Sequence, residues 1–251
     1  MMPAGKALSE SPLPQGERRP VLVELFTSEG CSSCPPADAL LIQLEKEPPV
    51  AAAEIIALGF HVDYWDDIGW KDRFSSSAFS RRQYDYAEAF STNSVYTPQM
   101  VVDGHTQFVG SDSKRAATAI ERATRAPKIA VRVSAVPAGS RRIKLTFQVP
   151  AFYPLNASDT AELSLAIAES DLFSEAKSGE NTGRRLNHTA VVRHFRALGA
   201  TKPGQETTRE LELMLPSDWH LQNCRAVAFL QERRSRVVLG AAQISLAQFA
   251  Q

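Results

Sequence analysis

The chain has 251 residues, of which 43% are hydrophobic and 22% are charged, and its formal net charge is zero. This composition is typical of a globular protein with enough apolar residues for one large or two ordinary domains. A neutral chain lacks the basic excess that binds nucleic acid, and no apolar run reaches the ~18 residues that span a bilayer. We therefore expect neither a nucleic-acid partner nor a membrane span.

Residues 1–19 are polar and interrupted by prolines, which predicts a disordered leader. They contain no apolar core of a signal peptide, so the sequence as written predicts a cytoplasmic protein. A signal removed from the chain would instead place it in the periplasm or outside the cell. The cysteine content fits either compartment, because a C-x-x-C pair serves as a reductant in the cytosol and as an oxidant or isomerase outside it.

Residues 20–126 alternate apolar runs with helical periodicities. The expected strands cover 20–27, 55–62, 99–102 and 105–109, and the expected helices cover 33–46, 77–90 and 112–125. The last two strands are joined by Asp103-Gly104, a strong hairpin signal. The order strand, helix, strand, helix, hairpin, helix predicts a thioredoxin-like domain over 20–126, with an inserted segment at about 63–90.

After Ala126-Pro127 the hydrophobic period changes to two, and about seven short strands follow. This pattern predicts an antiparallel β-sandwich domain over 128–249. Within it, the polar, turn-rich segment 179–188 is predicted to be a long loop. Contacts from this loop to the first domain, through residues such as Glu180, Arg184 or His188, are the less favoured interpretation. The fold class is therefore α/β, with a thioredoxin-like domain followed by the sandwich.

Two of the three cysteines, Cys31 and Cys34, form a C-x-x-C motif between a predicted buried strand and a predicted helix. Unpaired backbone N–H groups and the helix dipole stabilise a thiolate at this place. The pattern predicts that Cys31 attacks and that Cys34 resolves the mixed disulfide. The expected function is thiol–disulfide oxidoreduction on protein or peptide thiols and disulfides, with an unidentified electron donor or acceptor and no cofactor.

Two alternatives to this redox interpretation stay open. The cysteine pair could hold a metal together with His61 or His105, although we assign no metal ligand. Alternatively, the chain could be a non-catalytic interaction module in which the disulfide only stabilises the fold. The third cysteine, Cys224, lies in the second predicted domain and is expected to be a buried packing residue.

Two further segments supply candidate substrate-binding residues. Pro98 is predicted to be a cis-proline that faces the cysteine pair, with Thr97 and Tyr96 holding a substrate chain. The segment 61–72 is rich in aromatic and acidic side chains that could line a cleft, or could form a cap between the domains. Its candidate residues are His61, Asp63, Tyr64 and Trp65.

Glu24 lies in the middle of the first apolar run, where a carboxylate can be buried only if it is paired or protonated. Two roles are equally compatible with this position. Glu24 could accept a proton from the inner cysteine, or it could form a hydrogen bond with Arg73, Arg81 or Arg82.

Four longer motifs carry a family resemblance. They read F-T-S-E-G-C-S-S-C-P-P-A-D at 26–38, H-V-D-Y-W-D at 61–66, G-W-K-D at 69–72 and Y-T-P-Q at 96–99. With them the chain, over about residues 20–249, resembles an uncharacterised bacterial family of unknown function with a thioredoxin-like fold. The resemblance implies that fold and no particular reaction. Members of this family often resemble exported proteins with an N-terminal signal, and the sequence as written departs from them there.

Overall fold

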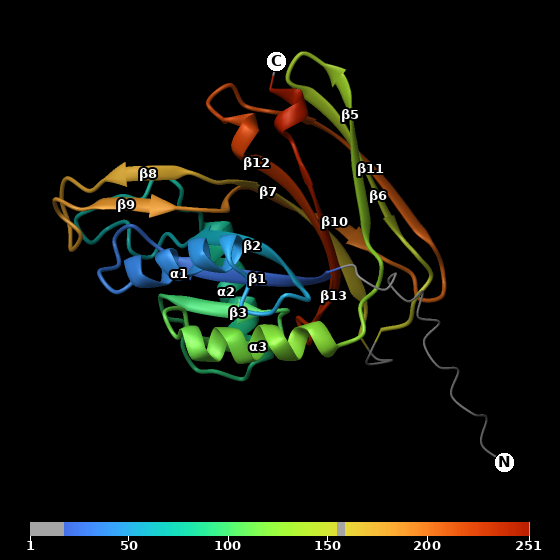
Figure 1. Cartoon of the computed structure of the whole chain (residues 1–251), viewed down its shortest axis with the longest axis horizontal. Helices are drawn as coiled ribbons and strands as arrows, with labels where there is room; N and C mark the ends of the chain where they lie inside the picture. Colours follow the sequence, from blue (N-terminus) through green and yellow to red (C-terminus); the bar gives the residue numbers. More distant parts are fainter. Residues whose placement is uncertain (1–17, 155–158, 251) are drawn as a thin grey trace.

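A computed structural model describes residues 18–154 and 159–250, so most of the predicted leader lies outside the described residues. The fold is mixed α/β and combines an eight-stranded mixed sheet with smaller sheets of three and two strands. Three α-helices pack at one end of the large sheet, as Figure 1 shows, and the three-stranded sheet lies at the other end. None of the helices in these two ranges is long and apolar enough to cross a membrane.

The elements of residues 18–126 match those predicted, with ends that differ by a few positions. They are β1 (Arg19–Thr27), α1 (Pro35–Lys46), β2 (Ala53–His61), α2 (Ser77–Ala89), β3 (Gln99–Val102), β4 (Thr106–Val109) and α3 (Ser113–Arg125). The second half contains β5 (Arg132–Gly139), β6 (Arg142–Val149), β7 (Ala161–Glu169), β8 (Leu172–Glu175), β9 (Arg185–His188), β10 (Val191–Ala200), β11 (Thr207–Met214), β12 (Cys224–Glu232) and β13 (Val238–Ser245).

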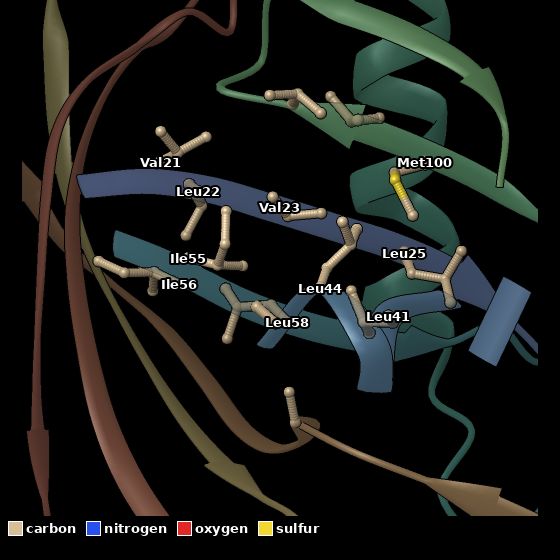
Figure 2. Close-up of a cluster of buried hydrophobic side chains, with 14 of the residues drawn as sticks. Val21, Leu22, Val23, Leu25, Leu41, Leu44, Ile55, Ile56, Leu58 and Met100 are labelled. Carbon is tan, nitrogen blue, oxygen red and sulfur yellow. The ribbon is translucent and has the colours of Figure 1, made fainter. Parts of the chain in front are cut away.

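Strand β1 lies inside the large sheet, parallel to β2 and antiparallel to β3. Successive side chains of a strand point to opposite faces of the sheet, so β1 packs against helices on both faces. Leu25 lies close to Ala37 of α1, whereas Phe26 packs edge-on against Tyr86 of α2. Figure 2 shows part of the resulting core, in which side chains of β1 and β2 gather with Leu41 and Leu44 of α1 and Met100 of β3.

The large sheet continues across the predicted domain boundary, which differs from the separate sandwich expected for residues 128–249. Its strand order is β13-β12-β7-β10-β2-β1-β3-β4, so four strands of the second half extend the first sheet. The junction is the pairing of Val191 in β10 with Gly59 in β2. A Cβ at Gly59 would lie 3.2 Å from the carbonyl oxygen of Thr189, so the absence of a side chain permits this close approach.

The remaining strands of the second half form two small sheets. Strands β11, β6 and β5 face β7 and β12 across a second hydrophobic core, which includes Phe147, Leu165 and Leu230. Strands β8 and β9 pair as a hairpin in a segment predicted to contain a loop. We call residues 172–188 the arm. Figure 1 shows the arm beside α1, at the end of the molecule away from β5, β6 and β11.

The Asp103-Gly104 turn between β3 and β4 gives a testable prediction. Both residues have positive φ, and a Cβ at Gly104 (φ +63°) would lie 1.7 Å from the carbonyl oxygen of Arg236. Gly104→Ala is therefore expected to lower the free energy of unfolding by about 2–3 kcal/mol, measured by chemical denaturation. Gly183→Ala is the matched control, because Gly183 also has positive φ (+77°) but nothing within 4 Å of its Cβ position. Equal losses in the two variants would contradict the steric argument.

Candidate functional site

Cys31 and Cys34 are joined in a disulfide where the chain passes from β1 into α1. Cys34 is the N-cap of α1, and its carbonyl oxygen accepts hydrogen bonds from the backbone N–H groups of Ala37 (2.8 Å) and Asp38 (3.1 Å). Prolines occupy the first two helical positions, where an N–H would have no partner within the helix. The sulfur atoms therefore lie at the positive end of the helix dipole, which favours a thiolate.

Both cysteines are fully buried, and Trp65 packs against the residue before them, Gly30. A Cβ at Gly30 would lie 3.1 Å from Cβ of Trp65, so a larger residue before Cys31 would collide with this side chain. Nε1 of Trp65 donates a hydrogen bond of 2.8 Å to Oγ1 of Thr97. Trp65 thus links the loop before Cys31 to the loop before Pro98.

The arm is hydrogen bonded to the loop that carries the disulfide. Nδ2 of Asn181 donates hydrogen bonds to the carbonyl oxygens of Glu29 (2.9 Å) and Cys31 (3.0 Å). The backbone N–H of Ser32 donates to Oε2 of Glu180 at 3.1 Å. The less favoured interpretation of segment 179–188, contact with the first half of the chain, is therefore confirmed.

The Thr97–Pro98 bond is cis, as predicted. Pro98 lies beside the first turn of α1, since Cβ atoms of Pro98 and Ala37 lie 3.1 and 3.0 Å from the Cβ position of Gly110. The side chain and the carbonyl of Tyr96 already have partners within the protein. Its hydroxyl donates to Gln107, and its carbonyl oxygen accepts a hydrogen bond of 2.7 Å from Gln83.

Asp63 and Tyr64 attach the 61–72 segment to helix α2. Oγ of Ser80 donates to Oδ1 of Asp63 at 2.5 Å and accepts from the backbone N–H of Asp63 at 3.1 Å. The hydroxyl of Tyr64 donates to Oε1 of Gln83 at 3.0 Å, and burial raises the pKa of Tyr64 to about 12. These two side chains therefore hold the segment against α2.

Glu24 points to the α2 face of the sheet, opposite to α1 and the cysteine pair. Its Oε1 accepts a hydrogen bond of 2.7 Å from Nε of Arg82, and its Oε2 accepts one from the hydroxyl of Tyr86. Arg82 also donates to Oε1 of Gln231 in β12 at 3.1 Å. Of the two roles considered, the structure therefore contains the hydrogen bond to an arginine. The side chain is on the wrong face to serve Cys34.

Behind the disulfide lies a buried group of five titratable side chains, which we call the His–carboxylate cluster. Its members are Glu29, Asp38, His61, Asp72 and His188. Nδ1 of His61 lies 2.6 Å from Oδ2 of Asp72, which also accepts the backbone N–H of Glu29 at 2.9 Å. The ring centroids of His61 and His188 are 4.9 Å apart. Sequence reasoning identified only His61 as a site residue.

His188 joins two of the carboxylates in this cluster. Its Nε2 lies 3.3 Å from Oε1 of Glu29, and its Nδ1 lies 4.0 Å from Oδ2 of Asp38. Oε2 of Glu29 accepts a hydrogen bond of 2.7 Å from Nε1 of Trp70. The acids at 29 and 38 flank the C-x-x-C motif in sequence, but no local signal connects them to a histidine 150 residues later.

The cluster contains carboxyl groups with opposite pKa shifts. Burial raises the pKa of Asp38 to about 7, an effect that His188 partly offsets and Asp72 reinforces. Burial alone would raise the pKa of Asp72, but His61 outweighs it and holds this pKa below its usual range. Burial alone would lower the pKa of His61, but Asp72 raises it above its usual value. His61 and Asp72 therefore each favour the charged form of the other, while Asp38 is partly protonated near neutral pH.

The family model described as "protein of unknown function (DUF1223)" matches residues 22–231. The chain belongs to this family. The DUF1223 match confirms membership of an uncharacterised family, as the sequence motifs indicated.

Two solved structures resemble this DUF1223 chain over most of its length. A crystal structure of a protein from Agrobacterium tumefaciens is 25% identical, with a TM-score of 0.67, and the match covers 91% of this chain and 95% of the other. HBP35 of Porphyromonas gingivalis is 15% identical, with a TM-score of 0.63, and the match covers 92% of this chain and 76% of the other. The second likeness shows the fold alone. No protein with a curated description matches.

The DUF1223 fold thus brings only some of the candidate residues together. Those gathered around the disulfide are Cys31, Cys34, Trp65, Thr97 and Pro98, and His61 lies in the cluster behind it. The side chains of Glu24, Asp63, Tyr64 and Tyr96 are bound instead to residues of α2 or β4.

Proposed function

We propose that this protein is a thiol–disulfide oxidoreductase acting through Cys31 and Cys34. Its first half would be a thioredoxin-like domain, and its second half a β-sandwich whose strands continue the same sheet. The observation that carries the proposal is the C-x-x-C disulfide at the N-terminus of α1, with Pro98 packed beside the first turn of that helix.

In the proposed reaction, the thiolate of Cys31 attacks a disulfide of a protein or peptide. A bond forms between Sγ of Cys31 and one substrate sulfur, and the other substrate sulfur leaves as a thiolate. Cys34 then attacks Sγ of Cys31, which re-forms the internal disulfide and releases the second substrate thiol. The helix dipole favours the Cys31 thiolate, and the hydroxyl of Ser33, whose Oγ lies 3.4 Å from Sγ of Cys31, can donate to it. A dithiol donor returns two electrons to the pair.

The burial of both cysteines favours a second candidate function, a non-catalytic module with a structural disulfide. Exchange requires the buried sulfurs to become accessible to a substrate, whereas a structural disulfide requires no such change. The metal-binding alternative lacks comparable support. Residues 18–154 and 159–250 contain no group of three or more His, Cys, Asp or Glu that could hold a metal ion.

A dithiothreitol-coupled insulin reduction assay tests the proposal. Cys31→Ser is expected to reduce turnover to the uncatalysed rate, because the attacking sulfur is removed. Cys224→Ala is the matched control and is expected to retain turnover. Cys224 is buried in β12, and this burial raises the pKa of its thiol to about 12, so it is unreactive. Turnover that survives Cys31→Ser would contradict the assignment, and a wild-type protein without exchange would favour the structural candidate.

A further inference from the structure

Asp38 is the cluster member closest in sequence to the inner cysteine. Cys34 has helical backbone angles (φ −78°, ψ −35°), and the backbone N–H of Asp38 donates to its carbonyl oxygen at 3.1 Å. Residues separated by four positions on a helix lie on the same face, with about 5–6 Å between their Cβ atoms. Asp38 is only 8% exposed, so the residue one helical turn after Cys34 carries a buried carboxyl group.

The groups that face Asp38 come from three other parts of the chain. His188 approaches from β9 in the arm, Glu29 from the loop after β1, and Asp72 from the loop before α2. Both ring nitrogens of His188 lack a hydrogen-bond partner among the described residues, although each lies within 4.0 Å of a carboxylate oxygen. His188 is therefore a buried polar group whose hydrogen-bonding capacity is not used to hold the fold together.

We propose that Asp38 is the group that exchanges a proton with Cys34 during the redox cycle, and that His188 adjusts its proton affinity. This inference rests on the proposed function. It assigns the proton to an acid on α1, influenced by a histidine from the second half of the chain, and not to Glu24 on β1.

In the mixed disulfide between Cys31 and a substrate, the Cys34 thiol gives its proton to the Asp38 carboxylate. The Cys34 thiolate forms a bond with Sγ of Cys31, and the substrate sulfur leaves with the electron pair of the broken bond. When a dithiol reduces the pair, the departing Cys34 thiolate takes the proton back from Asp38. A carboxyl group with a pKa of about 7 can both accept and release a proton near neutral pH.

The resolving step can be measured on its own. The reduced protein is mixed with saturating hydroxyethyl disulfide, acid-quenched at intervals, and analysed by mass spectrometry for the mixed disulfide and the closed pair. We expect the wild-type rate of closure to rise with pH through an inflection near 7. Asp38→Asn should lose this inflection and close at least ~10-fold more slowly at pH 7, with its rate rising only as the thiol itself ionises. Asp38→Glu should restore the inflection.

Two further variants distinguish proton exchange from a structural effect. His188→Gln should move the inflection to higher pH, because His188 lowers the pKa of Asp38. This variant keeps the proposal testable if Asp38→Asn does not fold. Glu24→Gln is the matched control, a buried carboxyl group on the opposite face of the sheet, and it should keep the wild-type profile.

The possible failures are distinguishable. An Asp38→Asn or His188→Gln profile equal to that of the wild type overturns the inference and leaves the proposed function in place. Loss of the inflection in Glu24→Gln with its retention in Asp38→Asn assigns the proton to β1 instead. A wild-type protein that forms no mixed disulfide at any pH overturns the proposed function itself.

Discussion

Arg82→Met is expected to lower the free energy of unfolding by about 3–5 kcal/mol. The guanidinium of Arg82 is 5% exposed and is hydrogen bonded to a Glu24 carboxylate that is 0% exposed. Methionine fills a similar volume but leaves this carboxylate without its counter-charge, and the desolvation cost of an unpaired buried charge is large. Denaturant-induced unfolding at neutral pH measures the loss.

The adjacent Arg81 provides the matched control for this prediction. Arg81 is exposed on the same helix, so Arg81→Met should change the free energy of unfolding by no more than about 0.5 kcal/mol. The double variant Glu24→Gln/Arg82→Met should recover most of the stability lost in Arg82→Met, because both charges are removed together. Equal losses in Arg81→Met and Arg82→Met would show that the buried ion pair is not the cause.

Asp38→Asn is expected to make the protein more stable than the wild type at pH 8, while the two are similar at pH 4. Burial raises the pKa of Asp38 from 3.8 to about 7 in the folded state. A group whose pKa is higher in the folded than in the unfolded protein adds to the free energy of unfolding. This stabilising contribution is fully present at a pH below the unfolded-state pKa, and it is lost as the pH rises through the folded-state pKa. A shift of about three pKa units corresponds to at most about 4 kcal/mol of unfolding free energy. Asparagine does not titrate, so the Asp38→Asn variant does not lose this stability as the pH rises.

The measurement is the difference in unfolding free energy between Asp38→Asn and wild type from pH 4 to pH 8. Asp72→Asn serves as a control of opposite sign. His61 holds the pKa of Asp72 below its usual value, so this carboxylate stabilises the fold above its unfolded pKa, and its removal should be costly at neutral pH. A difference between Asp38→Asn and wild type that does not vary with pH would contradict the buried-acid argument.

The sequence predicted each helix and strand of residues 20–126 because these elements have strong local periodicity. It did not predict that Val191 would pair with Gly59, since periodicity identifies a strand but not its neighbour. The alternation in β7 was recognised, yet both of its faces are buried. Leu165 belongs to one core, and Ala166 to the other.

The candidate site, too, was predicted only where local sequence signals mark it. The C-x-x-C motif and Thr97-Pro98 are local signals, and the structure contains both the disulfide and the cis bond. Strands β8 and β9 are four residues each, L-F-S-E and R-L-N-H, and are too short and too polar to show a period. His188 therefore could not be connected with Asp38 from the sequence. The buried carboxylate at Glu24 was recognised, but its partner was one of three arginines that sequence alone did not distinguish.

The hydrogen bonds from Asn181 to Glu29 and Cys31 join residues 152 and 150 positions apart. Because translation proceeds from the N-terminus, Cys31 and Cys34 are synthesised long before the arm. In that interval an oxidising partner can reach both thiols of the nascent chain without displacing the arm. In the folded protein both cysteines are buried, so exchange with a partner then requires a local opening of the structure. The order of translation thus separates the time at which this disulfide is easily formed from the time at which it is protected.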